Sequence, residues 1–362
     1  MEILLGPDSL RNYFREIYGP EARVLRIIEL FSGKEKGVEL KGFGYGTPYL
    51  IEVLVNGEVK RVVLETIRPG GFGHEHFSDR AQILLWQHSA FNKLPRHVRS
   101  IDVGAFTTSG TLKSLRDCSE FFILTEYVEG RPYYLDLEDI KARGELTSLD
   151  IERCLALSDY LVEVHSVKGV GLESLYIRRV RDLIGHGECI MGLIDSYPPG
   201  LDYADERTLM EIERRCLEWR WRLKEKTHRC ARVHGDFHPW NILFHEGTDF
   251  TVLDRSRGEW GEPADDLAAM TINYLFYSLQ AYGEFRDSFK RLFEIFWENY
   301  LNKAGDEEIL TVIQPYYAWR GLVIASPIWY PNLAKETRIK IFNFIKSILE
   351  TEKIDIKLNL NF

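Results

Sequence analysis

The sequence predicts an α/β protein with two lobes, and three observations lead to that expectation. The chain has 362 residues, which is long enough for two lobes that each bury a core of their own. Runs rich in β-branched and aromatic residues, typical of strands, follow one another between residues 24 and 67. From Ser148 onward the apolar residues recur at helical spacing instead. We therefore expect the first lobe to hold a mostly antiparallel sheet and the second to be mainly helical.

The N-terminal part predicts a helix, a set of strands and a second helix. Residues 8–18 form the first helix, because four apolar residues fall on one of its faces: Leu10, Tyr13, Phe14 and Ile17. Strands are predicted at 24–31, 38–43, 49–55, 59–67, 98–106 and 120–128, and Asn56-Gly57 is a hairpin turn. Ser78 is the expected cap of a helix over 78–91, whose predicted apolar face is Ala81, Leu84, Leu85 and His88.

Helices dominate the remainder of the chain. They are predicted at 148–167, 205–228, from Ala264 onward, and near 284–302, 306–325 and 335–351. In the first of these helices, Leu149 is expected to face the core and His165 to be a structural residue. The alternation Trp219-Arg220-Trp221-Arg222 predicts one buried and one amphipathic tryptophan, which fits an acidic helix better than a nucleic-acid surface.

Composition limits the possible partners and surroundings of the chain. The net charge of −9 argues against binding that depends on neutralising nucleic-acid phosphates. The five cysteines are scattered and form no CxxC pair, so we expect reduced thiols and a cytoplasmic location. Charged residues interrupt the apolar run at the start of the chain, so no signal peptide is predicted, and no apolar stretch is long enough to span a membrane. The oligomeric state is left open.

The most informative stretch is His234-Gly235-Asp236-Phe237-His238-Pro239-Trp240-Asn241. It forms a tight loop between the apolar Val233 and the apolar run 242–244. A further strand, 250–253, ends in Asp254. This set of residues suits phosphoryl transfer, because one carboxylate can accept the proton of an attacking hydroxyl while an amide and a second carboxylate hold magnesium on nucleotide phosphates.

The spacing H-G-D-x-H-x-x-N followed by an aspartate resembles the aminoglycoside phosphotransferase and choline kinase family, which has a protein-kinase-like fold. The resemblance implies Asp236 as the catalytic base and Asn241 and Asp254 as magnesium ligands. It also implies ATP or GTP as the phosphate donor and a small molecule as the acceptor. Its two lobes would be a nucleotide-binding lobe at 1–128 and a catalytic and substrate lobe at 129–362. Arg255 departs from the apolar or aromatic residue that is usual after the metal-binding aspartate.

Three further segments are interpreted through the same resemblance. Gly42, Gly44 and Gly46 alternate between two predicted strands, where backbone amides approach nucleotide phosphates closely. The run 121–130 resembles the hinge that presents its backbone to adenine, and Glu126 and Val128 are the residues expected to make these contacts. Ala264-Asp265-Asp266-Leu267-Ala268 resembles the helix start whose aspartate, here Asp266, braces the catalytic-loop backbone, although simple helix capping would also explain an acid there.

One residue conflicts with the resemblance. Glu65 occupies the position where a lysine normally binds the α- and β-phosphates, and neither Asp79 nor Gln82 is the glutamate expected to pair with that lysine. Glu65 could hold magnesium or pair with Arg68 or Arg80, or else the site is catalytically altered. The leading hypothesis is a kinase that phosphorylates a small-molecule hydroxyl. The alternatives are a nucleotide-binding pseudokinase or scaffold and, with less support, transfer of a nucleotidyl group.

Overall fold

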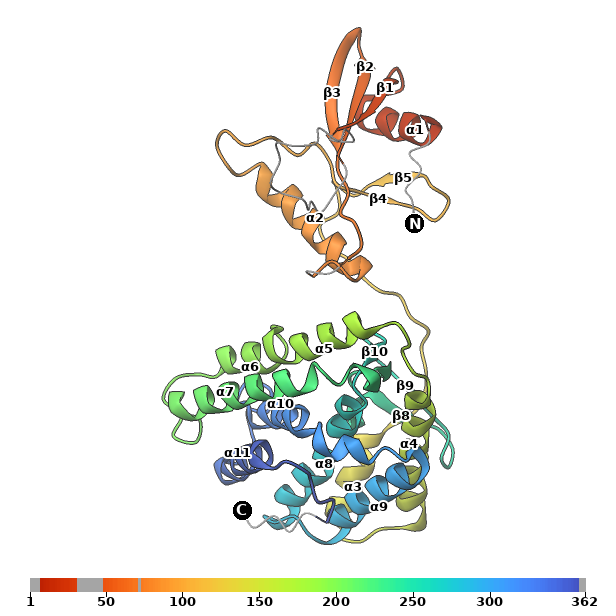
Figure 1. Ribbon diagram of the computed structural model, residues 1–362. Coiled ribbons are helices and arrows are strands. Elements are labelled where there is room, and N and C mark those ends of the chain that lie inside the picture. Colours follow the sequence, from red (N-terminus) through yellow and green to blue (C-terminus); the bar gives the residue numbers. More distant parts are fainter. Residues whose placement is uncertain (1–6, 31–47, 71–72, 358–362) are drawn as a thin grey trace. The chain divides into compact units, whose positions relative to one another are not determined.

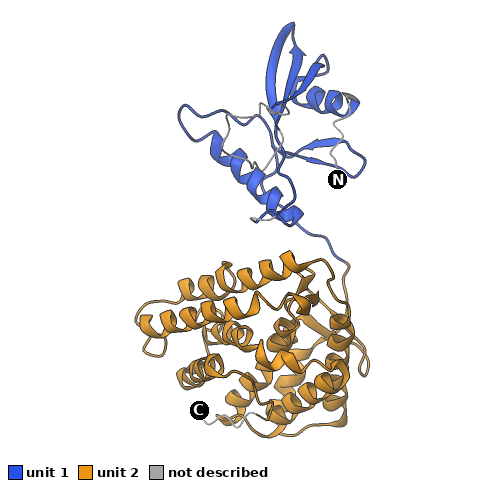
Figure 2. Cartoon of the chain, viewed as in Figure 1, with its two compact units in different colours: residues 1–125 blue, residues 126–362 orange. Residues whose placement is uncertain are grey.

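The computed structural model describes residues 7–30, 48–70 and 73–357, which divide into two compact units, residues 1–125 and 126–362 (Figure 2). In the first unit, a three-stranded antiparallel sheet of order β1-β2-β3 follows a helix (Figure 1). These elements are α1 Pro7–Tyr18, β1 Arg23–Glu29, β2 Tyr49–Val55 and β3 Glu58–Leu64. Asn56 and Gly57 join β2 to β3, and both have positive φ (52° and 84°), as a two-residue hairpin turn requires.

The core of the first unit lies between α1 and the sheet. Leu10 and Phe14 from α1 are buried against alternate residues of β2, namely Ile51, Val53 and Val55. Alternation places these three side chains on one face of the central strand, which is why the helix covers that face. The predicted first helix and the strand at 49–55 are confirmed. The predicted strand at 59–67 is shorter than expected, because β3 ends at Leu64.

The rest of the first unit departs more from expectation. It contains α2 Phe77–Phe91, β4 Gly104–Phe106 and β5 Leu112–Ser114. The cap predicted at Ser78 is wrong, because the helix begins one residue earlier and the Asp79 side chain accepts the His76 amide at 2.7 Å. The expected apolar face of α2 is also wrong in degree, since none of the residues in this helix is buried. The strand predicted at 98–106 is reduced to its last three residues.

The segment 120–128 is not a strand, which corrects another prediction. Its backbone has no regular secondary structure, and none of the described strands pairs with it. Phe122, Ile123 and Leu124 are exposed. A run of β-branched and aromatic residues becomes a strand only where a neighbouring strand takes its hydrogen bonds, and this segment lacks such a neighbour in the described part of the chain. The glycine loop with Gly42, Gly44 and Gly46 lies outside the described residues.

The second unit is mainly helical, as predicted, and the mixed α/β class of the chain is confirmed (Figure 1). Its α-helices are α3 Tyr133–Arg143, α4 Ser148–Ser166, α5 Glu173–Gly185, α6 Ile190–Ser196, α7 Glu206–Leu223, α8 Ala264–Tyr282, α9 Asp287–Ala304, α10 Gln314–Ala325 and α11 Lys335–Glu350. Short 3-10 helices lie at η1 Thr227–Arg229, η2 Pro239–Asn241 and η3 Glu307–Thr311. Short strands form the sheets β6-β8-β9 and β7-β10 from β6 Arg131–Pro132, β7 Ala231–Arg232, β8 Ile242–Phe244, β9 Phe250–Val252 and β10 Trp260–Gly261.

Helix α8 is the centre of the second unit. Every residue from Ala264 to Leu279 is buried, and α9 and α10 both pack against this helix. A helix that is enclosed on all sides must be apolar nearly all round, so its two buried acids, Asp265 and Asp266, need partners within the protein.

Two tryptophans and a leucine test the predicted helix faces. In α7, Trp219 is buried and Trp221 is exposed, as predicted. Leu149, expected to face the core, is instead 39% exposed in the first turn of α4.

No helix in the described part of the chain is both long enough and apolar enough to cross a membrane.

Candidate active site

The loop at 234–241 connects the short strand β7 with β8, and the Asp266 side chain accepts hydrogen bonds from its backbone. One carboxylate oxygen of Asp266 accepts the His234 amide at 2.8 Å, and the other accepts the Gly235 amide at 2.7 Å. Gly235 has φ of +85°, a left-handed conformation that glycine adopts without strain. Asp266 lies in the first turn of α8, so a core helix fixes the path of the loop. The brace that the sequence resemblance implied for Asp266 is thus confirmed.

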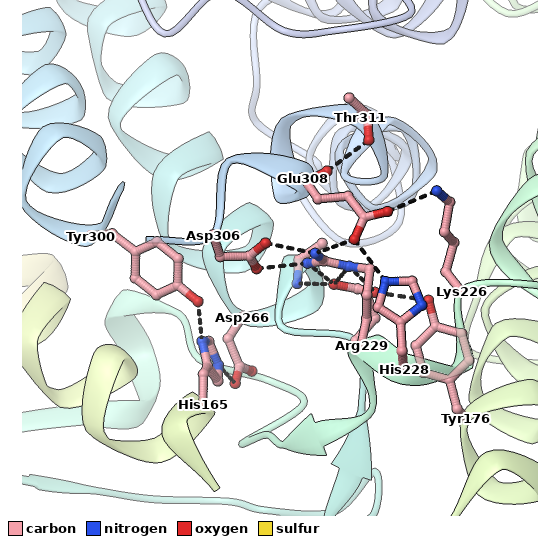
Figure 3. Close-up of polar contacts among 12 residues, drawn as sticks. His165, Tyr176, Lys226, His228, Arg229, Asp266, Tyr300, Asp306, Glu308 and Thr311 are labelled. Carbon is pink, nitrogen blue, oxygen red and sulfur yellow. Dashed lines mark hydrogen bonds and ion pairs between the residues drawn. The ribbon is translucent and has the colours of Figure 1, made fainter. Parts of the chain in front are cut away.

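His165 completes this support from α4 (Figure 3). Its Nε2 lies 3.0 Å from an Asp266 oxygen, and its Nδ1 lies 2.9 Å from the Tyr300 hydroxyl. Burial alone would raise the pKa of Asp266, but hydrogen bonds from His165 and from the His234 amide outweigh it and lower that pKa. Asp266 is therefore an ionised, fully hydrogen-bonded acceptor, and His165 is buried, consistent with the structural role predicted for it.

Asp236 points its carboxylate at two arginines and a histidine. Its Oδ1 accepts a hydrogen bond from Arg320 Nη1 at 2.5 Å, and its Oδ2 lies 3.7 Å from Arg257 Nη2 and 3.7 Å from His238 Nε2. Burial alone would raise the pKa of Asp236, but His238, Arg320 and Arg257 together hold it well below its ordinary value. The carboxylate is therefore ionised and can accept a hydrogen bond, which is the state that a group orienting a hydroxyl needs.

Arg320 is a site residue that the sequence reasoning missed. It is buried in α10, and besides Asp236 it donates to the Gly235 carbonyl at 3.1 Å and to Asp265 Oδ1 at 2.9 Å. The other Asp265 oxygen accepts from Arg179 at 3.1 Å. Burial raises the pKa of Asp265 although both arginines oppose that shift. The available signal was a lone arginine within the otherwise apolar stretch 315–325, where a buried charge needs a partner.

The expected metal ligands flank the β8–β9 hairpin: Asn241 directly precedes β8, and Asp254 follows β9 by two residues. The Leu253 amide donates to the Asn241 carbonyl at 2.8 Å. Asp254 therefore directly follows the residue whose backbone is bound to Asn241. The side-chain nitrogen of Asn241, Nδ2, donates to the Asp236 carbonyl at 3.0 Å, so the side-chain oxygen Oδ1 is the atom left for a ligand. Asp254 is exposed and has φ of +54°.

These two residues are chemically suited to magnesium, which takes oxygen ligands. Among the described residues, no group of three or more His, Cys, Asp or Glu side chains could hold a metal by itself. Magnesium commonly binds one or two carboxylates and completes its shell with phosphate and water oxygens. One carboxylate and one amide oxygen therefore fit this ion when a nucleotide supplies phosphates.

The arginine that departs from the family pattern has a structural role. Arg255 donates from Nε and Nη2 to the Val233 carbonyl, at 3.0 and 2.8 Å, and from Nη2 to the Glu259 carbonyl at 3.2 Å. It thereby joins the segment after Asp254 to the residue that precedes the 234–241 loop. This side chain therefore links the segment that carries Asp254 to the loop that carries Asp236.

A second buried network holds the start of α8 (Figure 3). Arg229 donates to both oxygens of Glu262, the nearest at 2.7 Å, and to Asp306 at 2.6 Å. The Tyr176 hydroxyl donates to Glu262 at 2.8 Å. Glu262 precedes α8 by two residues, so these contacts position the helix turn that carries Asp265 and Asp266. The sequence reasoning did not identify this network, because its members are far apart along the chain.

In the first unit, Glu65 and both arginines suggested as its partners lie within the described residues. Glu65 follows the end of β3 and is exposed. Arg80, one of its two suggested partners, donates instead to the His74 and His76 carbonyls, each at 2.9 Å.

Of the hinge residues, Glu126 is exposed and Val128 is half-buried.

Comparisons with known proteins agree with the motif. The Phosphotransferase enzyme family matches residues 53–301. A search of curated proteins found no significant match.

Similar solved structures include a glucosamine kinase in complex with glucosamine, ADP and inorganic phosphate, with 15% identity, 60% of each chain covered and a TM-score of 0.41. An ethanolamine kinase of Plasmodium vivax has 14% identity, 96% of this chain and 86% of that chain covered, and a TM-score of 0.38. A choline kinase of Cryptosporidium parvum has 11% identity, 95% of each chain covered and a TM-score of 0.38. The match of 249 residues, more than half of the chain, shows that this protein belongs to the Phosphotransferase enzyme family.

Proposed function

We propose that the protein is a small-molecule kinase that moves the γ-phosphate of ATP or GTP to an alcohol of its acceptor. The observation that carries the proposal is the placement of Asp236. Its loop is bound through two backbone amides to a buried carboxylate on a core helix, while its own carboxylate is kept ionised. A carboxylate that orients a hydroxyl and accepts its proton must be ionised and held in position, because catalysis gains most from groups that are positioned before the reaction begins.

In the proposed reaction, Asp236 accepts a hydrogen bond from the acceptor hydroxyl and takes its proton as the new bond to phosphorus forms. The bond between the γ-phosphorus and the β-phosphate oxygen breaks, and the nucleoside diphosphate leaves. Asn241 and Asp254 would hold magnesium through their side-chain oxygens, and that ion would neutralise charge on the phosphates. We assign nucleotide binding to the N-terminal lobe, through the backbone at Gly42, Gly44 and Gly46, and to the hinge backbone at Glu126 and Val128.

A nucleotide-binding pseudokinase is the second candidate, and Glu65 is the observation that favours it. An exposed carboxylate at the position of the phosphate-binding lysine repels phosphate rather than binding it. In a pseudokinase the nucleotide would bind but no phosphoryl group would move.

The experiment that tests the proposal compares transfer and binding in one variant. The full-length protein would be incubated with γ-labelled ATP or GTP, magnesium and a panel of alcohols selected by thermal shift. Asp236→Asn should reduce transfer about 10²- to 10⁴-fold, the usual range for a lost general base, while calorimetry shows nearly unchanged nucleotide affinity.

Asp249→Asn is the matched control, because it is the same chemical change on an exposed residue of the β8–β9 hairpin. Transfer by Asp236→Asn at the parent rate would remove the assignment of the base. Nucleotide binding without transfer to any alcohol, in the parent protein, would favour the pseudokinase.

A further inference from the structure

The two oxygens of Asp236 are in different situations. Oδ1 is occupied by the short hydrogen bond from buried Arg320. Oδ2 has no contact closer than 3.7 Å among the ion pairs of this residue, and the groups at that distance are Arg257 and His238. Oδ2 is therefore the oxygen that an incoming hydroxyl can reach, and the Arg257 guanidinium lies beside its path.

Arg257 has donor capacity that the protein does not use. Its Nε is buried and has no hydrogen-bond partner among the described residues, and its Nη2 lies 3.7 Å from Asp236 Oδ2, beyond hydrogen-bond distance. Nη1 and Nη2, rather than the buried Nε, are therefore the donors open to a ligand. Its Nη1 contacts Glu188 at 3.0 Å, but the Glu188 side chain is 64% exposed. Exposed ion pairs contribute little free energy and exchange readily with other anions. The guanidinium carbon lies 5.1 Å from the centre of the Trp319 ring, which holds the arginine in place without occupying its donors.

Buried Asp265 offers no partner to a cation. Both oxygens of buried Asp265 are bound, one by Arg320 and the other by Arg179. Three arginines, Arg179, Arg257 and Arg320, thus contact two buried acids, Asp236 and Asp265, and in the described part of the chain the closest ion-pair partner of Arg257 is exposed Glu188. An ammonium group beside Asp236 would meet the cation of Arg257, whereas an anion would find donors that are ready to bind it.

We propose that the acceptor carries an anionic group, a carboxylate or a phosphate monoester, which Arg257 binds in place of Glu188 while the hydroxyl approaches Asp236 Oδ2. This inference rests on the proposed kinase function and names its substrate class. Because Arg257 and Oδ2 are 3.7 Å apart, the hydroxyl and the anionic group must lie within a few bonds of each other. Short hydroxy acids and short phosphorylated alcohols meet that requirement.

The test uses four compounds built on one three-carbon skeleton. Glycerate carries a carboxylate, glycerol 3-phosphate a phosphate, glycerol no charge, and 3-amino-1,2-propanediol an ammonium group. Binding to the full-length protein would be measured by saturation-transfer NMR, which needs no turnover. We expect at least one anion to bind about tenfold or more tightly than glycerol or the amine, the range for a charge-assisted contact, and the stronger of the two anions identifies the group.

Three variants connect that binding to the site. Arg257→Gln should weaken the anion about tenfold, whereas Arg291→Gln, the same change at an exposed arginine of α9, should leave it unchanged. Glu188→Gln removes the competing carboxylate on the surface and should tighten the anion, so this variant tests the idea even if Arg257→Gln fails to fold.

Tightest binding of the amine, no binding of either anion, or unchanged anion binding in both Arg257→Gln and Glu188→Gln would overturn the inference. The outcome for the proposed function is separate. Phosphoryl transfer to the amine would support a kinase and refute the anionic acceptor. Arg257-dependent anion binding without transfer to any alcohol would refute the kinase and leave an anion site.

Discussion

Replacing Arg320 by glutamine should be among the most damaging single changes in the second unit. The arginine joins Asp236, Asp265 and the Gly235 carbonyl through contacts of 2.5, 2.9 and 3.1 Å, and its side chain is only 8% exposed. Glutamine has no charge and too few donors to replace these contacts, so two buried carboxylates lose their common cation. Breaking a buried ion pair by removing one partner costs about 3–5 kcal/mol, and we expect a loss of unfolding free energy in that range at pH 7.5.

The size of this loss should depend on pH, and its sign follows from the carboxylates. Arg320 lowers the pKa of Asp236 and opposes the rise that burial causes in the pKa of Asp265. Without Arg320, the pKa of both acids in the folded state should rise. When the pKa of a carboxylate is higher in the folded than in the unfolded state, the folded state takes up the proton first as the pH falls. The variant should therefore recover part of its lost stability between pH 7 and the pKa of an unfolded aspartate, near 4.

Urea unfolding at pH 7.5 and at pH 5 measures both effects. Arg320→Lys keeps the charge but not the planar fork, so it should lose less stability than the glutamine variant. Arg291→Gln, which removes an exposed arginine, should change the unfolding free energy by no more than about 0.5 kcal/mol. A glutamine variant as stable as the Arg291 control would refute the argument, and so would a destabilisation that grows as the pH falls.

Three other changes test separate parts of the site. Asp266→Asn should lower the unfolding free energy by about 2–4 kcal/mol, because asparagine has one side-chain oxygen and leaves the backbone N–H of His234 or Gly235 without its acceptor. An unchanged urea midpoint would argue against the brace. Asp254→Ala should weaken the dependence of nucleotide affinity on magnesium, measured by calorimetry with and without the ion, and a parent protein that shows no such dependence would contradict the metal assignment. Glu65→Lys should slow phosphoryl transfer, because in a working site the carboxylate would orient a metal ion or an arginine and the lysine would place a like charge against that cation. Its effect on stability should be small, because the residue is exposed, and a faster variant would instead point to a degenerate kinase whose lost lysine had been restored.

The elements that the sequence predicted well are those in which local pattern and burial agree. The strand Tyr49–Val55 alternates correctly because one of its faces lies on α1, and the hairpin residues Asn56 and Gly57 tolerate positive φ. The segment 120–128 shows the opposite case. Its residues favour strands, but pairing depends on a neighbour that no local pattern supplies. The prediction that Leu149 faces the core was wrong for a related reason, since a position in the first helical turn can face solvent even when its residue is apolar.

The candidate site was predictable in part. The loop 234–241 is contiguous in sequence, so its spacing reveals the relation between Asp236 and Asn241, and the resemblance to a known family added Asp266. Arg320 and Arg257 could not be found in this way, because only the packing of α10 and of the loop after β9 brings them to Asp236. Long-range ion pairs of this kind leave no periodic signal. A charge within an apolar helix shows that a partner is needed, but not which residue it is.

The brace between α8 and the 234–241 loop has a consequence for how the site is lost. Surface loops usually open in local fluctuations that cost far less free energy than unfolding of the whole domain. Here the amides of His234 and Gly235 are bound to a side chain of a helix that is buried on every side. Separating these two amides from Asp266 would leave a fully buried carboxylate without two of its hydrogen bonds, which costs more free energy than opening an ordinary surface loop. The loop therefore belongs to the same cooperative unit as the core, and its geometry should persist for as long as the second unit remains folded.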